Sequence, residues 1–231
     1  EELGLAVPAT TWHVARDGLA ETVNFLALIT GSLGKIALDV MLMASTEFAE
    51  VYEPFVTGRG ASSTMPQKRN PISSELMLAA SKAVRQHAGL MLDAMVQDLE
   101  RATGPWHAEW MALPESFVLT AGALNQAKFM LSGLIVDDAR MRQNLGISSG
   151  LIVAEAVMME LAPYTGRQQA HDIVYAACRK VSDAGGTLAQ ALQGIPKVAR
   201  HFDRAALERL TAPENYLGMA PRMVDAVLKG R

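Results

Sequence analysis

Long intervals without proline limit most strongly how this chain can fold. Proline is absent from residues 9–53, 72–104 and 115–162. Each interval is rich in Ala, Leu, Met and Val, which suit a helix, whereas an internal proline interrupts one. No alternating apolar pattern of the strand type reaches a useful length. The sequence therefore predicts an all-α fold built from several long helices.

The first interval predicts a helix that is apolar on almost every side. Its large aliphatic residues recur three or four positions apart: Leu26, Ile29, Leu33, Ile36, Val40 and Met41. A helix of this kind has to be covered by other helices around most of its circumference. Because a chain of 231 residues supplies too few long helices for that, we expect the protein to form an oligomer.

The remaining intervals predict two more long helices and then a series of short ones. Asn70 and Pro71 form a start signal for the second helix, an N-cap residue followed by proline in the first turn. A third helix is expected over residues 114–144. Beyond it, Gly and Pro recur often enough to allow only short helices. We therefore expect a long-helix bundle domain over residues 1–147 and a small helical domain over residues 148–231.

The composition favours a soluble protein without nucleic acid or membrane partners. The chain has 21 basic and 24 acidic residues, a formal net charge of −3, so no basic surface is expected. The uncharged apolar window at residues 22–34 is shorter than the roughly 20 residues that cross a bilayer. The acidic start of the chain lacks the basic region of a signal peptide. Cys178 is the only cysteine and is expected to be inert, which fits a reducing, cytoplasmic location.

The connection between the first two helices is rich in reactive and conformationally special residues. Residues 57–70, the signature loop, read TGRGASSTMPQKRN and end where the second helix is expected to start. Free backbone N–H groups and the helix dipole favour an anion at such a start. Lys68 and Arg69 add positive charge. The pattern predicts a carboxylate-binding edge that closes over a substrate, although the serines could instead serve turn hydrogen bonds while Lys68 is merely solvated.

A family resemblance supports the catalytic interpretation. Residues 62–71, SSTMPQKRNP, resemble the signature GSSxMPxKxNP of the fumarase/aspartase superfamily, with Ala61 in place of the family's glycine. The resemblance implies that the N-terminal domain of the family lies upstream and is absent from this chain. It also implies a homotetramer whose long helices form a twenty-helix core. Each active site would then be built from three subunits.

The resemblance assigns roles to residues of the signature loop. It implies that Ser62 is the catalytic base and that Lys68 supports catalysis by holding a substrate carboxylate. The implied substrate-binding residues of the loop are Ser63, Thr64, Met65 and Asn70. A serine acts as a base only if its hydroxyl is made acidic, which nearby N–H groups and a lysine can do. The implied chemistry takes a small polycarboxylate and needs no metal or organic cofactor.

Three further segments narrow the resemblance within the superfamily. Residues 10–17 (TTWHVARD), 99–115 (LERATGPWHAEWMALPE) and 212–228 (APENYLGMAPRMVDAVL) are most similar to the bacterial 3-carboxy-cis,cis-muconate cycloisomerases of protocatechuate breakdown. The implied reaction is intramolecular addition of a carboxylate to a double bond, with proton transfer at the adjacent carbon, which gives 4-carboxymuconolactone. Adenylosuccinate lyases carry a phosphate-binding arginine where this chain has Trp110, and losing that cation weakens phosphate binding.

Other interpretations stay open at this point. An adenylosuccinate lyase, or a related lyase that eliminates fumarate, would share the loop, and a catalytically silent helical oligomer would share the fold. His13 and Asp17 could form a weak metal pair, but His13 and Arg16 are better explained as substrate-binding residues or subunit contacts. Arg101 and Glu109 are expected to form a structural ion pair.

Overall fold

The described part of the chain is mainly helical. The computed structural model describes residues 2–60, 64–65 and 67–230. These residues form ten α-helices, two short 3-10 helices and one pair of two-residue strands, so the all-α prediction is confirmed. The chain divides into two compact units, one ending at Asp138 and one beginning at Ala139. The functional domain limits of 1–147 and 148–231 stay a prediction.

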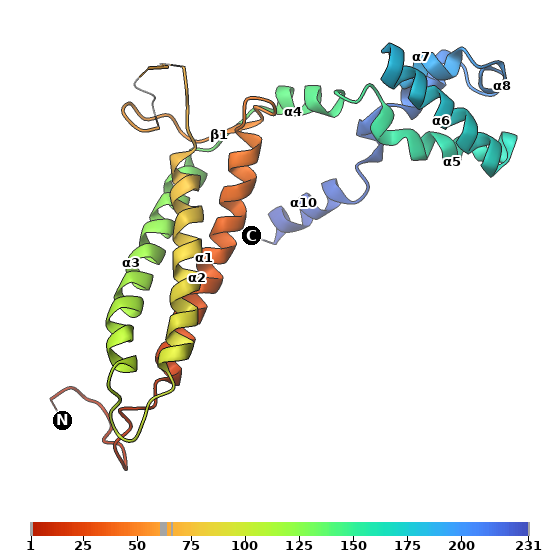
Figure 1. Cartoon of the computed structure of the whole chain (residues 1–231). Helices are drawn as coiled ribbons and strands as arrows, with labels where there is room; N and C mark the ends of the chain where they lie inside the picture. The colour runs from red at the N-terminus through yellow and green to blue at the C-terminus, as the bar shows by residue number, and fades with distance from the viewer. Residues whose placement is uncertain (1, 61–63, 66, 231) are drawn as a thin grey trace. The chain divides into compact units, whose positions relative to one another are not determined.

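Three long helices lie side by side in the first unit (Figure 1). They are α1 (Asp17–Met43), α2 (Ile72–Ala94) and α3 (Pro105–Ser132). The buried positions of α1 recur three or four residues apart, and most are small: Ala20, Val23, Leu26, Thr30, Gly34, Ala37 and Val40. At Gly34, a Cβ atom would lie 2.7 Å from the hydroxyl oxygen of Ser81 on α2. The close approach of α1 to α2 therefore depends on glycine at this position.

A short strand pair joins two connections of the first unit. β1 (Val51–Tyr52) follows α1, and β2 (Ile135–Val136) follows α3. The two strands are antiparallel, with Val51 opposite Val136. Next to this pair, a Cβ atom at Gly133 would lie 2.8 Å from Cβ of Pro54, so the backbone of one connection packs closely against the Pro54 ring of the other. The segment that leads into the signature loop is therefore fixed to the bundle.

The third helix begins and ends earlier than predicted. The expectation of a helix over residues 114–144 is wrong, because Pro114 lies inside α3 instead of at its start. An internal proline removes one backbone hydrogen bond, which the packed helix tolerates here. Gly133 is the C-cap residue of α3, and the following segment forms β2 and the separate helix α4 (Asp138–Leu145).

The second unit consists of short helices around its own apolar core. After α4, which begins at the boundary between the units, its elements are η1 (Leu151–Val153), α5 (Ala154–Thr165), α6 (Arg167–Ala184), α7 (Leu188–Gln193), α8 (Pro196–Ala199), α9 (Arg204–Leu210), η2 (Pro213–Tyr216) and α10 (Ala220–Lys229). The core contains buried aliphatic side chains, among them Val157, Leu161, Val174, Leu188, Leu192 and Leu207. Thr187 and Gln190 form a capping box at the start of α7. Short helices were the expected feature of this part of the chain.

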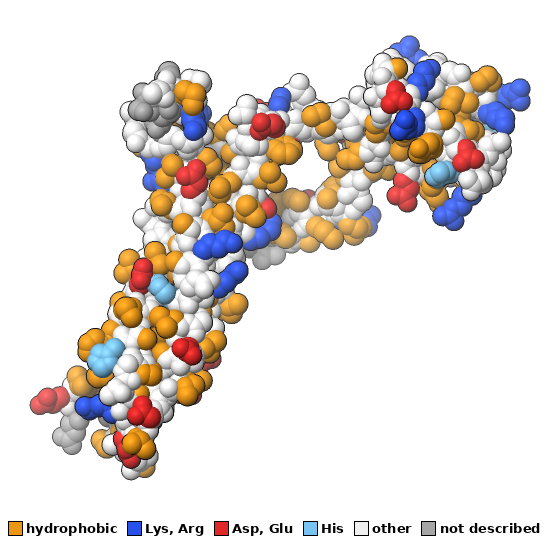
Figure 2. Space-filling model, viewed as in Figure 1, with side chains coloured by type: hydrophobic (Ala, Val, Ile, Leu, Met, Phe, Trp, Pro, Cys, Tyr) orange, Lys and Arg blue, Asp and Glu red, His pale blue; other side chains and the backbone are white. Residues whose placement is uncertain are grey.

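Large apolar side chains remain on the surface of the first unit. Figure 2 shows them along the length of the bundle. On α1 they are Phe25, Leu28, Leu38 and Leu42, and on α3 they include Met111, Phe117, Val118, Leu124 and Leu131. By length and composition alone α1 could cross a membrane, and one face of it packs against α2 and α3. Exposed apolar surface of this extent is typical of a protein with a binding partner.

Candidate functional site

One backbone oxygen joins the two ends of the signature loop. The Gly60 carbonyl accepts hydrogen bonds from the Asn70 backbone N–H and from the Asn70 side-chain Nδ2, both at 3.1 Å. Gly60 has a φ angle of +68°, and a Cβ atom there would lie 2.7 Å from the Asn70 carbonyl oxygen. Glycine is therefore required at this position. The bond to Gly60 also orients the Asn70 amide.

The helix start after the loop is capped by a carboxylate of the chain itself. The prediction of Asn70 as N-cap residue is wrong, because Pro71 takes that place and has no side-chain acceptor. Instead, the Glu53 carboxylate accepts hydrogen bonds from the Ser73 N–H at 3.0 Å and from the Ser74 N–H at 2.8 Å. The Ser74 hydroxyl donates to it as well, at 2.8 Å. A carboxylate suits the positive end of a helix dipole, so the N–H groups expected to bind a substrate anion are engaged by Glu53.

A groove with cationic side chains lies beside this helix start. It has a volume of about 760 Å³ and runs between the end of α1 and the loop. Its lining includes Lys68, Arg69, Asn70, Tyr52, Ala44 and Met65. The Arg69 guanidinium lies over the Phe55 ring, 5.0 Å from the ring centroid, which restricts its position without neutralising it. Two cations and an amide around one groove suit a ligand with carboxylate groups.

The loop residues predicted from the family resemblance fall into two groups. Lys68, Asn70 and Met65 line the groove, and the exposed Thr64 precedes Met65 in the chain. Ser62 and Ser63, the predicted base and its neighbour, lie outside the described residues. The groove therefore brings together three of the predicted residues.

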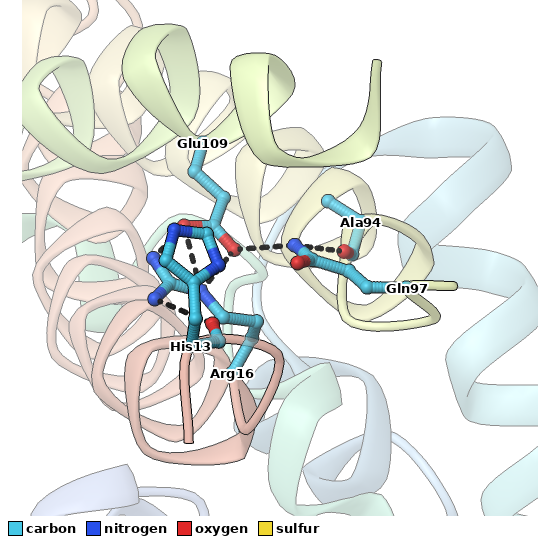
Figure 3. A network of polar contacts seen from close by, with 5 residues as sticks. All are labelled: His13, Arg16, Ala94, Gln97 and Glu109. Carbon is cyan, nitrogen blue, oxygen red and sulfur yellow. Dashed lines mark hydrogen bonds and ion pairs between the residues drawn. The ribbon is translucent and has the colours of Figure 1, made fainter. Parts of the chain in front are cut away.

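A second polar cluster lies where α1 and α3 begin (Figure 3). The Arg16 side chain donates to both carboxylate oxygens of Glu109, with Nε 2.9 Å from Oε1 and 3.1 Å from Oε2, and Nη2 also bonds Oε2. The Glu109 side chain is 3% exposed, and Gln97 donates to it at 3.3 Å. The hydrogen bond to Glu109 raises the pKa of Arg16 above its ordinary value. The predicted Arg101–Glu109 pair is wrong, because Glu109 pairs with Arg16.

Aromatic side chains gather next to this ion pair. The Trp106 ring lies edge to face against His13 at 4.8 Å between centroids and against Trp110 at 5.2 Å. His107 lies 4.8 Å from Trp110. The Nδ1 atom of His13 is shielded from solvent and has no hydrogen-bond partner among the residues that the structure describes. Trp110 is 59% exposed, so the cluster presents an aromatic face to solvent.

The predicted site residues lie at opposite ends of one helix. His13 and Arg16 come just before α1, whereas the groove of Lys68 and Asn70 includes Ala44, which follows α1. A helix of 27 residues rising about 1.5 Å each is about 40 Å long. The two sets therefore cannot act on one small molecule within a single chain. Among the described residues, no group of three or more His, Cys, Asp or Glu side chains could hold a metal ion.

Two residues at the base of the signature loop have contacts that the sequence motif does not indicate. Glu53 caps α2 from 20 residues earlier in the chain, a distance at which no local capping pattern exists. Arg59 bonds α2 and α3 and stands between two glycines of positive φ, Gly58 and Gly60. The paired glycines were the one available signal, since they permit an unusual backbone path around a single side chain.

Family models match both parts of the chain. The model described as Lyase matches residues 1–85, and the model described as Adenylosuccinate lyase C-terminus matches residues 150–227. With the helical bundle and the signature motif, these matches define the class of protein. The chain belongs to the fumarase/aspartase superfamily, as the resemblance implied.

Individual relatives extend this classification. The chain is 46% identical to the 3-carboxy-cis,cis-muconate cycloisomerase of Pseudomonas aeruginosa, over 99% of this chain and 50% of the relative. It is 48% identical to trans-aconitate decarboxylase 1 of Mycosarcoma maydis, over 98% of this chain and 46% of the relative. A crystal structure of a fumarate lyase from Mesorhizobium sp. BNC1 is 55% identical, with a TM-score of 0.86 over all of this chain and 51% of that one. The chain thus spans about half the length of the relatives it matches.

Proposed function

We propose that the full-length protein is a 3-carboxy-cis,cis-muconate cycloisomerase that forms 4-carboxymuconolactone in protocatechuate breakdown. The observation that carries the proposed chemistry is the superfamily motif at residues 62–71, of which Lys68 and Asn70 line one groove. The similarity to the Pseudomonas aeruginosa cycloisomerase supports it. The Trp110 position, where a nucleotide-specific lyase needs a cation, supports a substrate without phosphate.

In the proposed reaction one carboxylate oxygen of the substrate attacks a double bond of the same molecule. This forms the C–O bond of the lactone, while a proton is added at the adjacent carbon. Ser62 exchanges that proton, and Lys68 holds the carboxylate next to the carbon, where negative charge develops. The Asn70 amide has two N–H bonds, of which one is directed to Gly60, so the other can bond the same carboxylate.

The substrate class of the proposal is broader than a single compound. The two relatives catalyse different reactions, but 3-carboxymuconate and trans-aconitate are both unsaturated tricarboxylates. Three carboxylates need several cations and N–H groups, and Lys68 and Arg69 supply two such cations at the groove. An unsaturated tricarboxylate is therefore the preferred class.

Adenylosuccinate lyase is the second candidate, and the family model that matches residues 150–227 favours it. It requires a phosphate-binding cation that Trp110 does not provide. A catalytically silent oligomer is the candidate of another class, and the retained motif residues from Ser62 to Asn70 argue against it.

The proposal includes a homotetramer with shared active sites, located in the cytoplasm and without a cofactor. Other subunits would cover the exposed apolar residues of α1 and α3. Such burial is favoured because apolar surface in contact with water costs free energy. Shared sites would also allow His13 and Arg16 of one subunit to contact a substrate held by the groove of another, while Ser63 belongs to the signature loop itself. Thr64 and Met65 complete the proposed substrate-binding set.

A substrate panel on the full-length enzyme tests the proposal. It consists of 3-carboxy-cis,cis-muconate, cis,cis-muconate without the third carboxylate, trans-aconitate and adenylosuccinate, each followed by absorbance. We expect lactonisation of the first compound and its loss in Ser62→Ala, with Ser148→Ala as control. Turnover of adenylosuccinate alone would overturn the proposal in favour of the lyase, and no turnover of any compound would favour the silent oligomer.

A further inference from the structure

The Arg59 side chain connects three elements at the base of the signature loop. Its Nη2 atom donates to the Ser73 hydroxyl on α2 at 2.6 Å and to the side-chain oxygen of Gln126 on α3. The guanidinium carbon lies 4.1 Å from the centroid of the Phe129 ring, also on α3. Ser73 is fully buried. Arg59 therefore ties the start of the loop to both helices that follow it.

The geometry of this contact suits arginine better than lysine. A planar guanidinium stacks on a ring while it donates in its own plane, a fixed geometry that the compact ammonium group of lysine lacks. The Arg59 Nε atom is shielded from solvent, without a partner among the residues that the structure describes. If Arg59 left this position, the polar groups that it bonds would stay enclosed without a partner. The free-energy cost of such unpaired groups favours the observed position of Arg59.

The contact also reaches the groove. Arg59 precedes Gly60, whose carbonyl holds the Asn70 amide, and Ser73 lies in the first turn of α2 just after Asn70. Movement of Arg59 would therefore shift the Gly60 carbonyl and with it the Asn70 amide. Lys68 is two residues from Asn70 and would move as well.

We propose that Arg59 is a positioning residue, which sets the places of Asn70 and Lys68 for catalysis through Gly60 and α2. Arg59 is not among the residues that line the groove, although it lines a small pocket of about 20 Å³ beside the groove together with Lys68 and Asn70. This inference rests on the proposed function of the groove, but not on which polycarboxylate the groove takes. If Arg59 has this role, its replacement should lower kcat more than it changes KM or the stability of the fold.

The test compares Arg59→Met and Arg59→Lys in the full-length enzyme with the control Arg179→Met, which removes an arginine from an exposed pair on α6. The substrate is whichever compound of the panel the wild type converts. We expect Arg59→Met to lower kcat by about tenfold or more, with KM changed less than about threefold, and Arg59→Lys to recover part of the loss. Phe129→Leu, which keeps the cation and removes the ring, should give a smaller loss. An unchanged kcat in Arg59→Met would overturn the proposal.

Limited trypsin digestion separates this inference from the proposed function. Cleavage after Lys68 and Arg69 needs no substrate, and we expect it to accelerate several-fold in Arg59→Met but not in Arg179→Met. If the wild type converts no compound of the panel, an accelerated cleavage still supports the positioning role, and an unchanged one overturns it. If both Arg59 variants fail to fold, Phe129→Leu decides: wild-type kcat and cleavage in that variant would overturn the proposal.

Discussion

The two ends of the long-helix bundle hold similar residue types but use their charges differently. Where α1 and α3 begin, the Arg16 guanidinium and the buried Glu109 carboxylate satisfy each other. At the groove, the carboxylate of Glu53 bonds backbone N–H groups instead of a cation. Arg69 there lies over an aromatic ring, which leaves its charge in place.

This difference separates an internal ion pair from a candidate ligand site. At a buried pair that is neutralised internally, an anion has to compete with the paired carboxylate for the cation. Arg69 lies over a ring and the Glu53 carboxylate bonds a helix start, an arrangement that favours a positive potential for an anion at the groove. The position of the carboxylate, and not the number of cations, therefore distinguishes the two ends.

The largest expected effect is the loss of the structural pair. Glu109→Ala removes the partner of Arg16 and leaves a poorly solvated cation, so we expect the free energy of unfolding to fall by about 3–5 kcal/mol. Thermal and urea unfolding of the full-length protein measure it. The matched control is Asp39→Ala, which breaks the exposed Lys35–Asp39 pair on α1 and should cost less than about 1 kcal/mol. Equal losses in both variants would contradict the comparison.

A substitution in the groove should lower the activity of the enzyme without lowering its stability. Lys68→Met removes a cation from the site of developing charge, so we expect kcat/KM to fall by about 100-fold or more while the melting temperature hardly moves. Lys82→Met, on an exposed position of α2, is the control with the same side-chain change. Wild-type activity in Lys68→Met would remove Lys68 from the site.

The capping carboxylate should have a smaller effect on stability. Glu53→Ala leaves the N–H groups of Ser73 and Ser74 without their acceptor, and we expect a loss of about 1–2 kcal/mol. Glu53→Gln keeps an acceptor oxygen without the charge and should lie between the alanine variant and the wild type. If the glutamine and alanine variants unfold alike, the charge is what stabilises the helix start.

The smallest expected effect is that of pH on the stability contributed by Arg16, for which we expect no change. The pKa of Arg16 is raised in the folded state by its hydrogen bond to Glu109, so the stability that Arg16 contributes is fully present below its unfolded-state value and is lost only in strong alkali. The stability difference between the wild type and Arg16→Met should therefore stay constant from pH 7 to about pH 10. A difference that shrinks within this range would show that the guanidinium is not what Glu109 stabilises.

The sequence predicted the helices better than their ends. Apolar spacing and missing prolines indicated α1 and α2 because both report on local backbone preferences. The start of α3 was misplaced, since Pro114 reads as a boundary although packing against α2 keeps it inside the helix. The N-cap prediction at Asn70 failed because Glu53, far away in the chain, supplies the acceptor.

The candidate site was also predicted only in part, because some of its contacts join residues that lie far apart in the chain. Lys68 and Asn70 belong to a contiguous motif and line one groove, while their contact with a substrate stays a prediction. Arg16 and His13 lie at the opposite end of α1, a separation that sequence spacing does not reveal. The partner of Glu109 was missed because 93 residues separate it from Arg16 in the chain.

The Gly60 carbonyl, which accepts both Asn70 hydrogen bonds, also bears on how this protein could be engineered. It brings residues 60 and 70 together, so the nine residues between them form a cassette with fixed attachment points. Cassettes of other lengths or sequences can be exchanged there at a small entropic cost, because loop closure depends only weakly on length. Any exchange of this segment has to retain Ser62 and Lys68 as well as Gly60 and Asn70, since the proposed reaction depends on them.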